Sequence, residues 1–323
     1  MTNCPSVALL DDFRRSFVEG APRLPELTTR LLLDTLGLGN RQVFDFLARA
    51  RPSQAEFEAW IIDTAGQPDP ALLSRYNSKM GRGEPSEAAQ DHLRAITAMP
   101  DVLDAAELAQ WEREGYVVVR EALTTDECAA LTGVLWDTIK ADPDQPESWS
   151  LAESDGIMVP VYQHPAQIKA RRNARIHKAF AQLWGTPDLW VTVDQMGFNP
   201  PERAGHVFRG SPVHWDVSLA RPIPFGTQAV LYLTDTAADQ GAFRCVPGFH
   251  HRIEAWLDGP EGQNPRDADF ENEARCVPGK EGDLVIWRQD LPHGASPNRA
   301  AKPRLVQYLN YYSPGLEVRE EWL

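Results

Sequence analysis

Four residues in the C-terminal half of the sequence have types and spacing that suit metal-dependent chemistry. His214 and Asp216 lie in the segment SPVHWDVSL, His293 lies in LPHGAS, and Arg304 follows eleven residues later. Two histidines and one carboxylate can occupy one face of an Fe(II) ion and leave the other face open to substrate and oxygen. An arginine adds a fixed cation that could anchor a dicarboxylate co-substrate. Together, these residue types favour an oxygenase.

The first pair would have to sit on a β-strand to act together. Successive side chains of a strand point to opposite faces, so His214 and Asp216 would share one face and Trp215 would point the other way. His293 ends a second strand pattern, GDLVIWRQDLPH, which a barrel could fold back beside the first. Alone, the H-x-D motif indicates little, because a chain with eight histidines often contains one by chance. A surface or core histidine beside an aspartate is then the simpler interpretation.

Arg304 gives the motif more weight. It opens the strand pattern PRLVQYLNYY, in which alternation would place Arg304, Val306 and Tyr308 on one face. An arginine that points into an apolar barrel is costly unless it meets an anion, and a carboxylate can pair with it through two hydrogen bonds. An exposed arginine at a strand edge is the alternative for this residue alone. The combination of the four residues favours the metal site.

The elements that would carry these residues lie after Trp190. Strand patterns follow one another there, separated by Gly and Pro turns, as in LWVTVDQMGF, HVFRG, SPVHWDVSL, TQAVLYLTD, GAFRCVPG, ARCVPG, GDLVIW and PRLVQYLNYY. Such frequent strands with few helices between them predict an antiparallel sandwich or barrel.

The preceding part of the chain is predicted to be helical. Leucines recur at helical spacing in LPELTTRLLLDTLGL, and Ser53 with Glu56 forms a capping-box pattern before FEAWII. From about residue 101 the pattern changes, and a strand is expected over 116–119. Thr124 and Glu127 then form a second capping-box pattern, and one helix is expected over 166–184. We therefore predict a helical N-terminal region of unknown role, 1–100, and a domain over 101–323.

Composition limits the class of protein. Hydrophobic residues make up 42% and charged residues 24% of the 323 residues, which is usual for a globular protein. No apolar run approaches the ~20 residues that span a bilayer, and the N-terminus lacks a secretory pattern, so a cytoplasmic location and no membrane association are expected. A net charge of −14 argues against nucleic acid as a partner. The four cysteines show no CxxC pair and are expected to be reduced thiols.

Residues 105 to 312 resemble the phytanoyl-CoA dioxygenase family of Fe(II)- and 2-oxoglutarate-dependent oxygenases. The matching stretches are WEREGYVVVREALTTDECAAL, RIHKAFAQLWGTPDLWVTVD, SPVHWDVS, AVLYLTDTAADQGAFRCVPGFHH and GDLVIWRQDLPHGASPNRAAKPRLVQY. The resemblance implies a mainly β fold with helices, whose core is a double-stranded β-helix (a jelly-roll, cupin-like barrel) preceded by the helical N-terminal region.

The resemblance also implies a reaction and roles for residues. His214, Asp216 and His293 are then the ligands of Fe(II), and Arg304 binds the distal carboxylate of the co-substrate 2-oxoglutarate. Tyr232 is a candidate to donate its hydroxyl to the co-substrate, and a core aromatic is its alternative. Oxygen is consumed, succinate and CO₂ are released, and an unactivated C–H bond of a small-molecule substrate is attacked. Asp216 favours hydroxylation, because related halogenases carry a small residue at that position.

Two other classes of protein remain as alternatives. A cupin-like barrel could use two histidines and an aspartate for metal-assisted hydrolysis or isomerisation, which leaves Arg304 without a task. A barrel that only binds a ligand would not need the three ligands and the arginine. The substrate is not evident from the sequence. The protein could form a homodimer through its N-terminal helical region.

Some residues depart from the family pattern or lie outside it. Phe249 stands where relatives more often have a small residue, and Ala295 stands where a hydroxyl can assist co-substrate binding. A structural hydrogen bond is expected for at least one of His250 and His251. The basic run KARRNARIHK could steer an anionic substrate, although most charge runs are solvated helix faces.

Overall fold

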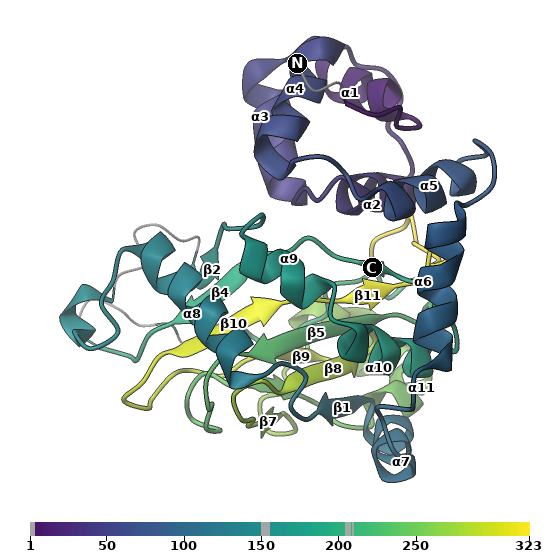
Figure 1. Ribbon diagram of the computed structural model, residues 1–323. Coiled ribbons are helices and arrows are strands. Elements are labelled where there is room, and N and C mark those ends of the chain that lie inside the picture. Colours follow the sequence, from purple (N-terminus) through teal and green to yellow (C-terminus); the bar gives the residue numbers. More distant parts are fainter. Residues whose placement is uncertain (1–3, 150–155, 204–207, 209) are drawn as a thin grey trace. The chain divides into compact units, whose positions relative to one another are not determined.

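The chain forms two compact units, each assembled from separate stretches of sequence (Figure 1). The structure is a computed structural model, which describes residues 4–149, 156–203, 208 and 210–323. Unit 1 comprises Met1–Pro100, Tyr162–Asp194 and Tyr311–Val318, and unit 2 comprises Asp101–Val161, Gln195–Asn310 and Arg319–Leu323. The division into domains 1–100 and 101–323 stays a prediction.

The N-terminal part of unit 1 is helical, as predicted. Its helices are α1 (Leu10–Val18), α2 (Glu26–Thr35), α3 (Asn40–Ala50), α4 (Gln54–Ala65), α5 (Pro70–Lys79) and α6 (Glu87–Ala98). The predicted capping box of Ser53 and Glu56 is confirmed at the start of α4. The apolar faces of α1 to α5 share one core, in which Phe13, Leu32 and Phe57 are almost fully buried.

The later segments of unit 1 contribute two helices and a two-stranded sheet. These elements are α9 (Pro165–Arg171), α10 (Ala174–Trp184), β3 (Trp190–Val191) and β11 (Tyr311–Tyr312), and β3 pairs antiparallel with β11. The prediction of one helix over 166–184 is wrong. The side chain of Asn173 accepts hydrogen bonds from the backbone N–H groups of Arg175 and Ile176, so it begins a new helix at this point.

Unit 2 is built on a six-stranded antiparallel sheet. Its order is β1 (Tyr116–Val119), β8 (Leu284–Arg288), β5 (Thr227–Tyr232), β10 (Arg304–Tyr308), β4 (Met196–Asn199) and β2 (Met158–Val159). The helices of this unit are α7 (Ala105–Glu114), α8 (Thr125–Ile139) and the short α11 (Ile253–Leu257), with 3₁₀ turns at Pro146–Ser148, Phe249–His251, Pro260–Gln263 and Pro265–Asp267. The predicted capping box of Thr124 and Glu127 begins α8.

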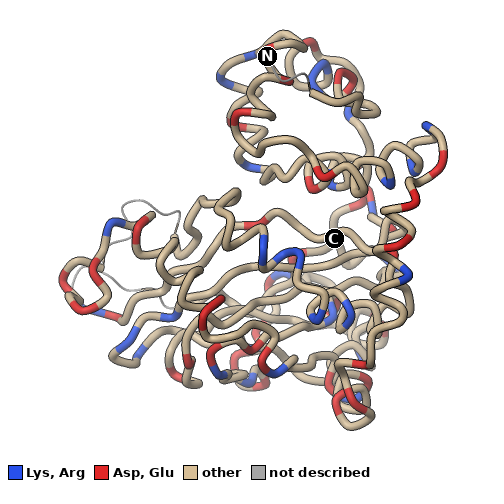
Figure 2. Tube along the Cα trace, in the orientation of Figure 1, with Lys and Arg blue, Asp and Glu red and all other residues tan. Residues whose placement is uncertain are grey.

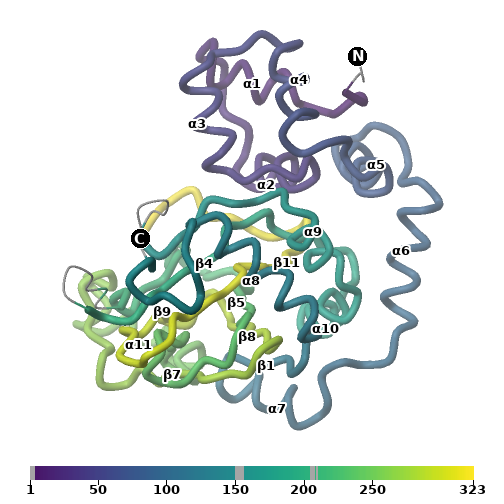
Figure 3. The backbone as a smooth tube through the Cα atoms, turned by 60° about the vertical axis from the view of Figure 1, so that its left-hand side comes forward, coloured from purple at the N-terminus to yellow at the C-terminus, as the bar shows by residue number. Residues whose placement is uncertain are grey.

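A second, three-stranded sheet completes the β core of unit 2. It consists of β7 (Arg275–Val277), β6 (Phe243–Cys245) and β9 (His293–Ala295). Alternate residues of the six-stranded sheet, such as Val230 and Val285, form one apolar cluster with Phe243 and Cys245 of the smaller sheet. On the larger sheet, α8 contacts β10 and β2 and lies next to β4 (Figure 3), where its Trp136 packs on Phe198. The two sheets therefore enclose the core of unit 2.

The fold is a mixed one of helices and antiparallel sheets, and the helices contribute more residues than the prediction of a mainly β chain allowed. The strand predicted for SPVHWDVSL forms only an isolated bridge at His214, and most of HVFRG lies outside the described residues. Acidic and basic residues are interspersed along the helices and loops (Figure 2). Among the described residues, every helix is too short or too polar to cross a membrane.

Candidate metal centre

The two histidines of the predicted triad lie directly opposite each other. His214 and His293 form an antiparallel bridge in which each backbone N–H donates to the other's carbonyl at 2.9 Å. Residues paired in this way project their side chains to the same side. The imidazole centroids are 5.0 Å apart. A return of the chain over 79 positions thus brings the two rings together.

Asp216 completes a three-residue cluster. Its Oδ1 lies 3.2 Å from Nε2 of His214, and its Oδ2 lies 3.1 Å from Nε2 of His293. The three candidate ligand atoms all lie within 4.8 Å of one another. Two ligands held about 2.1 Å from one ion at right angles are about 3 Å apart. The spacing therefore fits three ligands on one face of a single metal ion.

Backbone carbonyls orient both imidazole rings. Nδ1 of His214 lies 2.7 Å from the carbonyl of Pro212, and Nδ1 of His293 lies 3.0 Å from the carbonyl of Leu291. A carbonyl can only accept, so each Nδ1 carries the proton and each Nε2 faces Asp216. This hydrogen-bond pattern is the usual support for a metal-ligating histidine.

Gln228 supports the carboxylate, and sequence reasoning missed it. Its Nε2 donates to Oδ2 of Asp216 at 2.7 Å, and its Oε1 accepts from the indole N–H of Trp287 at 3.2 Å. Because an indole can only donate, Trp287 fixes which end of the amide faces Asp216. The signal in the sequence was a polar amide within the apolar strand TQAVLYLTD.

Hydrogen bonding governs the charge of this cluster. Burial would raise the pKa of Asp216, but hydrogen bonds from His214, His293 and Gln228 hold it well below its usual range. The hydrogen bond to Asp216 in turn raises the pKa of His214. A metal ion would replace the protons that the imidazoles share with the carboxylate.

Trp215 points away from the triad, as predicted. Its indole N–H donates to the carbonyl of Asp290, and its ring lies within 6 Å of those of Phe249, Trp256 and Phe270. Phe249 therefore occupies an aromatic cluster, which accounts for a large residue at this position.

Arg304 is almost fully buried, on the inward face of β10. Only 2% of its surface is exposed. Its Nη1 donates to the carbonyl of Gly241 at 2.9 Å, and its Nη2 lies 3.4 Å from the hydroxyl of Tyr308. Nε has no hydrogen-bond partner among the described residues. A buried guanidinium with uncharged partners and an unused donor suits an anionic ligand.

Asn199 lies beside Arg304 and was not predicted from the sequence. The two residues are opposite each other in the pairing of β4 with β10. Asn199 is fully buried, and neither its Oδ1 nor its Nδ2 has a partner in the described chain. Its amide could therefore hydrogen-bond the same ligand as Arg304.

Tyr232 is buried in the same sheet, and its hydroxyl already has two partners. It donates to the carbonyl of Val277 at 2.8 Å and accepts from the backbone N–H of Phe243 at 2.9 Å. These bonds tie β5 to both β6 and β7. The predicted co-substrate role would require one of them to be replaced, and it stays a prediction.

The remaining residues singled out from the sequence have structural partners. His250 and His251 both place Nε2 against the carbonyl of Glu112, at 3.1 and 2.8 Å, as expected. The backbone N–H of Ala295 donates to the hydroxyl of Ser211 at 2.8 Å, and the hydroxyl of Ser296 lies 3.4 Å from the carbonyl of Ala238. All four cysteines are free thiols.

Comparison with protein families gives one match. The family described as phytanoyl-CoA dioxygenase (PhyH) matches residues 111–306, which is more than half of the chain. A putative phytanoyl-CoA dioxygenase from Dictyostelium discoideum is 22% identical over 257 residues, covering 62% of this chain and 73% of that protein. The matched region contains His214, Asp216, His293 and Arg304.

Solved structures resemble this chain in fold. The non-heme alpha-ketoglutarate-dependent carbocyclase SnoK from nogalamycin biosynthesis superposes with a TM-score of 0.50 at 20% identity, covering 67% of this chain and 87% of SnoK. The epimerase SnoN, in complex with Fe³⁺, alpha-ketoglutarate and nogalamycin RO, gives a TM-score of 0.49 at 20% identity, covering 70% and 86% of the two chains. At 20% identity, the likeness to SnoK concerns the fold alone.

Proposed function

Because the chain belongs to the phytanoyl-CoA dioxygenase family of Fe(II)- and 2-oxoglutarate-dependent oxygenases, we propose that His214, Asp216 and His293 hold its iron. The observation that carries this assignment is the convergence of two Nε2 atoms on one carboxylate at 3.1 and 3.2 Å. Two imidazoles and one carboxylate are the ligands that non-heme Fe(II) oxygenases use, with open positions on the opposite face. The two antiparallel sheets would form the double-stranded β-helix.

The residues around the ligands keep the site ordered. The carbonyls of Pro212 and Leu291 hold the imidazoles in the tautomer that ligates through Nε2. Gln228 holds Asp216 in place through Oδ2 and leaves its Oδ1 on the side of His214. When bound, iron and 2-oxoglutarate supply the oxidation, in which the co-substrate and O₂ become succinate and CO₂ while the substrate is oxidised.

Arg304 would bind the distal carboxylate of 2-oxoglutarate. Its guanidinium is buried, and its neighbours at hydrogen-bond distance are a carbonyl and a phenol, neither of which neutralises its charge. A carboxylate would supply both the missing acceptor and the counter-charge. The alternatives of a metal hydrolase or a simple binding barrel give this residue no comparable task.

We propose hydroxylation of a small molecule as the outcome. Asp216 would occupy the coordination position that a halogenase leaves to halide, and both histidines lie beside it. The same three ligands would also permit desaturation or ring formation, so the outcome is to be established with substrate. A cytoplasmic location and a homodimer through residues 1–100 stay predictions.

The reaction type can be tested without knowing the substrate. Purified protein is loaded with Fe(II), 2-oxoglutarate and ascorbate without oxygen, oxygen is admitted, and succinate is measured; in the absence of substrate, ascorbate supplies the two electrons that reduce the second oxygen atom to water. We expect succinate from the wild type, and neither iron binding nor succinate from Asp216→Ala. A wild type that binds iron but forms no succinate under these conditions would contradict the oxygenase assignment.

The role of Arg304 has its own test. Arg304→Met should raise the 2-oxoglutarate concentration needed for half-maximal succinate formation by about tenfold or more, since hydrogen bonds to charged groups contribute about 1.5–3 kcal/mol. Arg275→Met is the matched control, because Arg275 is an exposed arginine on the smaller sheet of the same unit. Equal co-substrate affinity in Arg304→Met and the control would show that the carboxylate binds elsewhere.

A further inference from the structure

Five arginines of the described chain are buried, and the groups that surround them differ. They are Arg14, Arg75, Arg171, Arg244 and Arg304. Three have a carboxylate within hydrogen-bond distance: Arg14 meets Glu19 at 2.7 Å, Arg75 meets Asp188 at 2.6 Å, and Arg244 meets Glu271 at 2.5 Å. Only Arg171 and Arg304, within this set, have uncharged partners alone. Arg304 is accounted for by the proposed co-substrate.

Arg171 is the second buried cation without a carboxylate at hydrogen-bond distance. It is 6% exposed, and its Nη1 and Nη2 donate to the carbonyls of Tyr162 at 2.6 Å and Asp194 at 3.1 Å. Its Nε has no hydrogen-bond partner in the described structure. Burial lowers the pKa of Arg171 to about 10, although the charges of Asp194 and Asp34 act against this shift. The charge is therefore only partly compensated within the protein itself.

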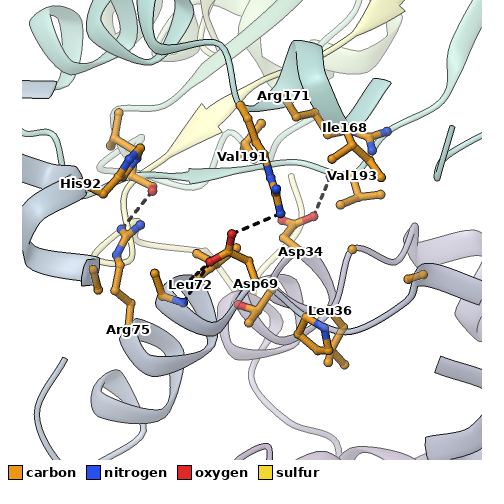
Figure 4. Close-up of a pocket in the computed structure, with 18 of the residues that line it drawn as sticks. Asp34, Leu36, Asp69, Leu72, Arg75, His92, Ile168, Arg171, Val191 and Val193 are labelled. Carbon is orange, nitrogen blue, oxygen red and sulfur yellow. Dashed lines mark hydrogen bonds and ion pairs between the residues drawn. The ribbon is translucent and has the colours of Figure 1, made fainter. Parts of the chain in front are cut away.

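Arg171 lines a cavity that belongs wholly to unit 1. The cavity has a volume of about 390 Å³, which lies in the range of small-molecule sites. Apolar side chains form much of its wall, namely Leu36, Leu72, Ile168, Leu189, Val191 and Val193. Figure 4 shows Arg75 and His92 on the left of the view, and Arg171 and Ile168 at the upper right with Asp34 below them.

The other charged groups of the cavity are largely neutralised. Arg75 is paired with Asp188, and Arg172 is paired with Asp69 at 3.2 Å. Asp34 accepts hydrogen bonds from the hydroxyl of Tyr312 at 2.7 Å and the backbone N–H of Val193 at 2.8 Å.

The histidines of the cavity add no charge at neutral pH. Burial lowers the pKa of His177 to about 4, and burial together with the charge of Arg75 lowers that of His92. Their rings, 5.3 Å apart, act as part of the wall. The cavity thus offers, among apolar surfaces, one buried cation that has no carboxylate at hydrogen-bond distance.

We propose that this cavity is a second binding site, which takes a small organic acid with an apolar body and a single carboxylate that pairs with Arg171. The apolar walls favour a hydrocarbon body, and the guanidinium favours a planar carboxylate that can accept two hydrogen bonds. A doubly charged anion such as a phosphate fits less well, because the carboxyl groups of Asp34 and Asp69 line the same cavity. A cationic ligand would meet Arg171 itself.

The proposal also explains the basic run in the sequence. KARRNARIHK spans the end of α9 and the start of α10, and Asn173 separates these two helices. The break leaves Arg171 buried, while the side chain of Arg172 remains largely exposed and reaches Asp69. One member of the run, Arg171, therefore lines the cavity as a buried cation without a carboxylate at hydrogen-bond distance, which a purely solvated helix face would not provide.

The test compares three ligands that share one apolar body. Octanoate, octanol and octylamine are titrated into the full-length protein by calorimetry at neutral pH. We expect octanoate to bind at least about tenfold more tightly than octanol, and octylamine not to bind. Equal affinity for octanoate and octanol would overturn the proposal, as would the absence of octanoate binding.

Variants locate the site and separate it from the metal centre. Arg171→Gln should abolish the preference for octanoate over octanol, and Leu72→Trp should block all binding by filling the cavity. Arg94→Gln, which removes an exposed arginine of α6, should change neither. Octanoate binding that survives Leu72→Trp would place the anion elsewhere, for example at Arg304, and would refute this site. Succinate formation is measured separately, so a failure here does not affect the proposed oxygenase activity.

Discussion

Asp34 gives unit 1 a pH-dependent stability that can be worked out from the structure. Its carboxyl group lines the cavity, and burial raises its pKa to about 7 despite the hydrogen bonds from Tyr312 and Val193. In the unfolded chain the pKa of an aspartate is about 3.9. The folded state therefore binds this proton more tightly than the unfolded state.

The sign and size of the effect follow from this difference. A group whose pKa is raised by folding contributes stability that is complete below the unfolded pKa and is lost as the pH rises through the folded pKa. For pKa values of about 7 and 3.9, the loss between roughly pH 6 and pH 8 is about 1.4 kcal/mol, or about tenfold in an equilibrium constant. Asp34→Asn has no such proton to lose.

Hydrogen exchange of the α2 amides measures this local stability. After correction for intrinsic exchange, wild-type protection factors should fall about tenfold between roughly pH 6 and pH 8 through Asp34, on top of changes that are common to all variants. Asp34→Asn should lack this component, and Asp45→Asn, which removes an exposed carboxylate of α3, should retain it. If Asp34→Asn and the wild type show the same pH dependence, the raised pKa of Asp34 is not the cause.

Two further predictions concern the candidate metal centre. Gln228→Leu removes the 2.7 Å hydrogen bond to Asp216, and we expect the affinity for Fe(II), measured by anaerobic titration, to fall by about 10–100-fold. An unchanged affinity would mean that Gln228 does not position the carboxylate. Tyr232→Phe removes two buried backbone hydrogen bonds and should lower the free energy of unfolding by about 1–3 kcal/mol, measured by denaturant titration. A fall in 2-oxoglutarate affinity without loss of stability would instead support the co-substrate role of Tyr232.

The geometry of the triad could be predicted only in part. Strand alternation indicated that His214 and Asp216 would lie on the same side, and the structure brings both to His293. The backbone around these two residues differs from the predicted β-strand. Only His214 forms a β-bridge, and Asp216 lies outside any strand. The pairing of His214 with His293 depends on how the segment around His293 folds back beside that of His214. The alternation of residues within either segment does not specify this register.

The sequence predicted helix starts correctly where they depend on residues only a few positions apart. Both capping boxes use a side chain three residues from its partner, and both are present. The break at Asn173 was also local, yet the periodicity on either side of it favoured one long helix. Membership of 162–194 in unit 1 depends on packing between distant segments, for instance Trp190 in the core of the N-terminal helices, and no pattern within the segment specifies it.

Arg171, Arg244 and Arg304 are all buried, so the difference between their partners, and not a difference in burial, supports both proposals. Arg244 is 8% exposed and Arg304 is 2% exposed, so both guanidiniums have lost most of their water. Arg244 recovers a counter-charge from Glu271, whereas Arg304 and Arg171 recover only neutral acceptors. A buried cation without a counter-charge lowers stability unless a ligand supplies one. It follows that 2-oxoglutarate should stabilise the protein through Arg304 and octanoate through Arg171, each effect being lost only in its own variant.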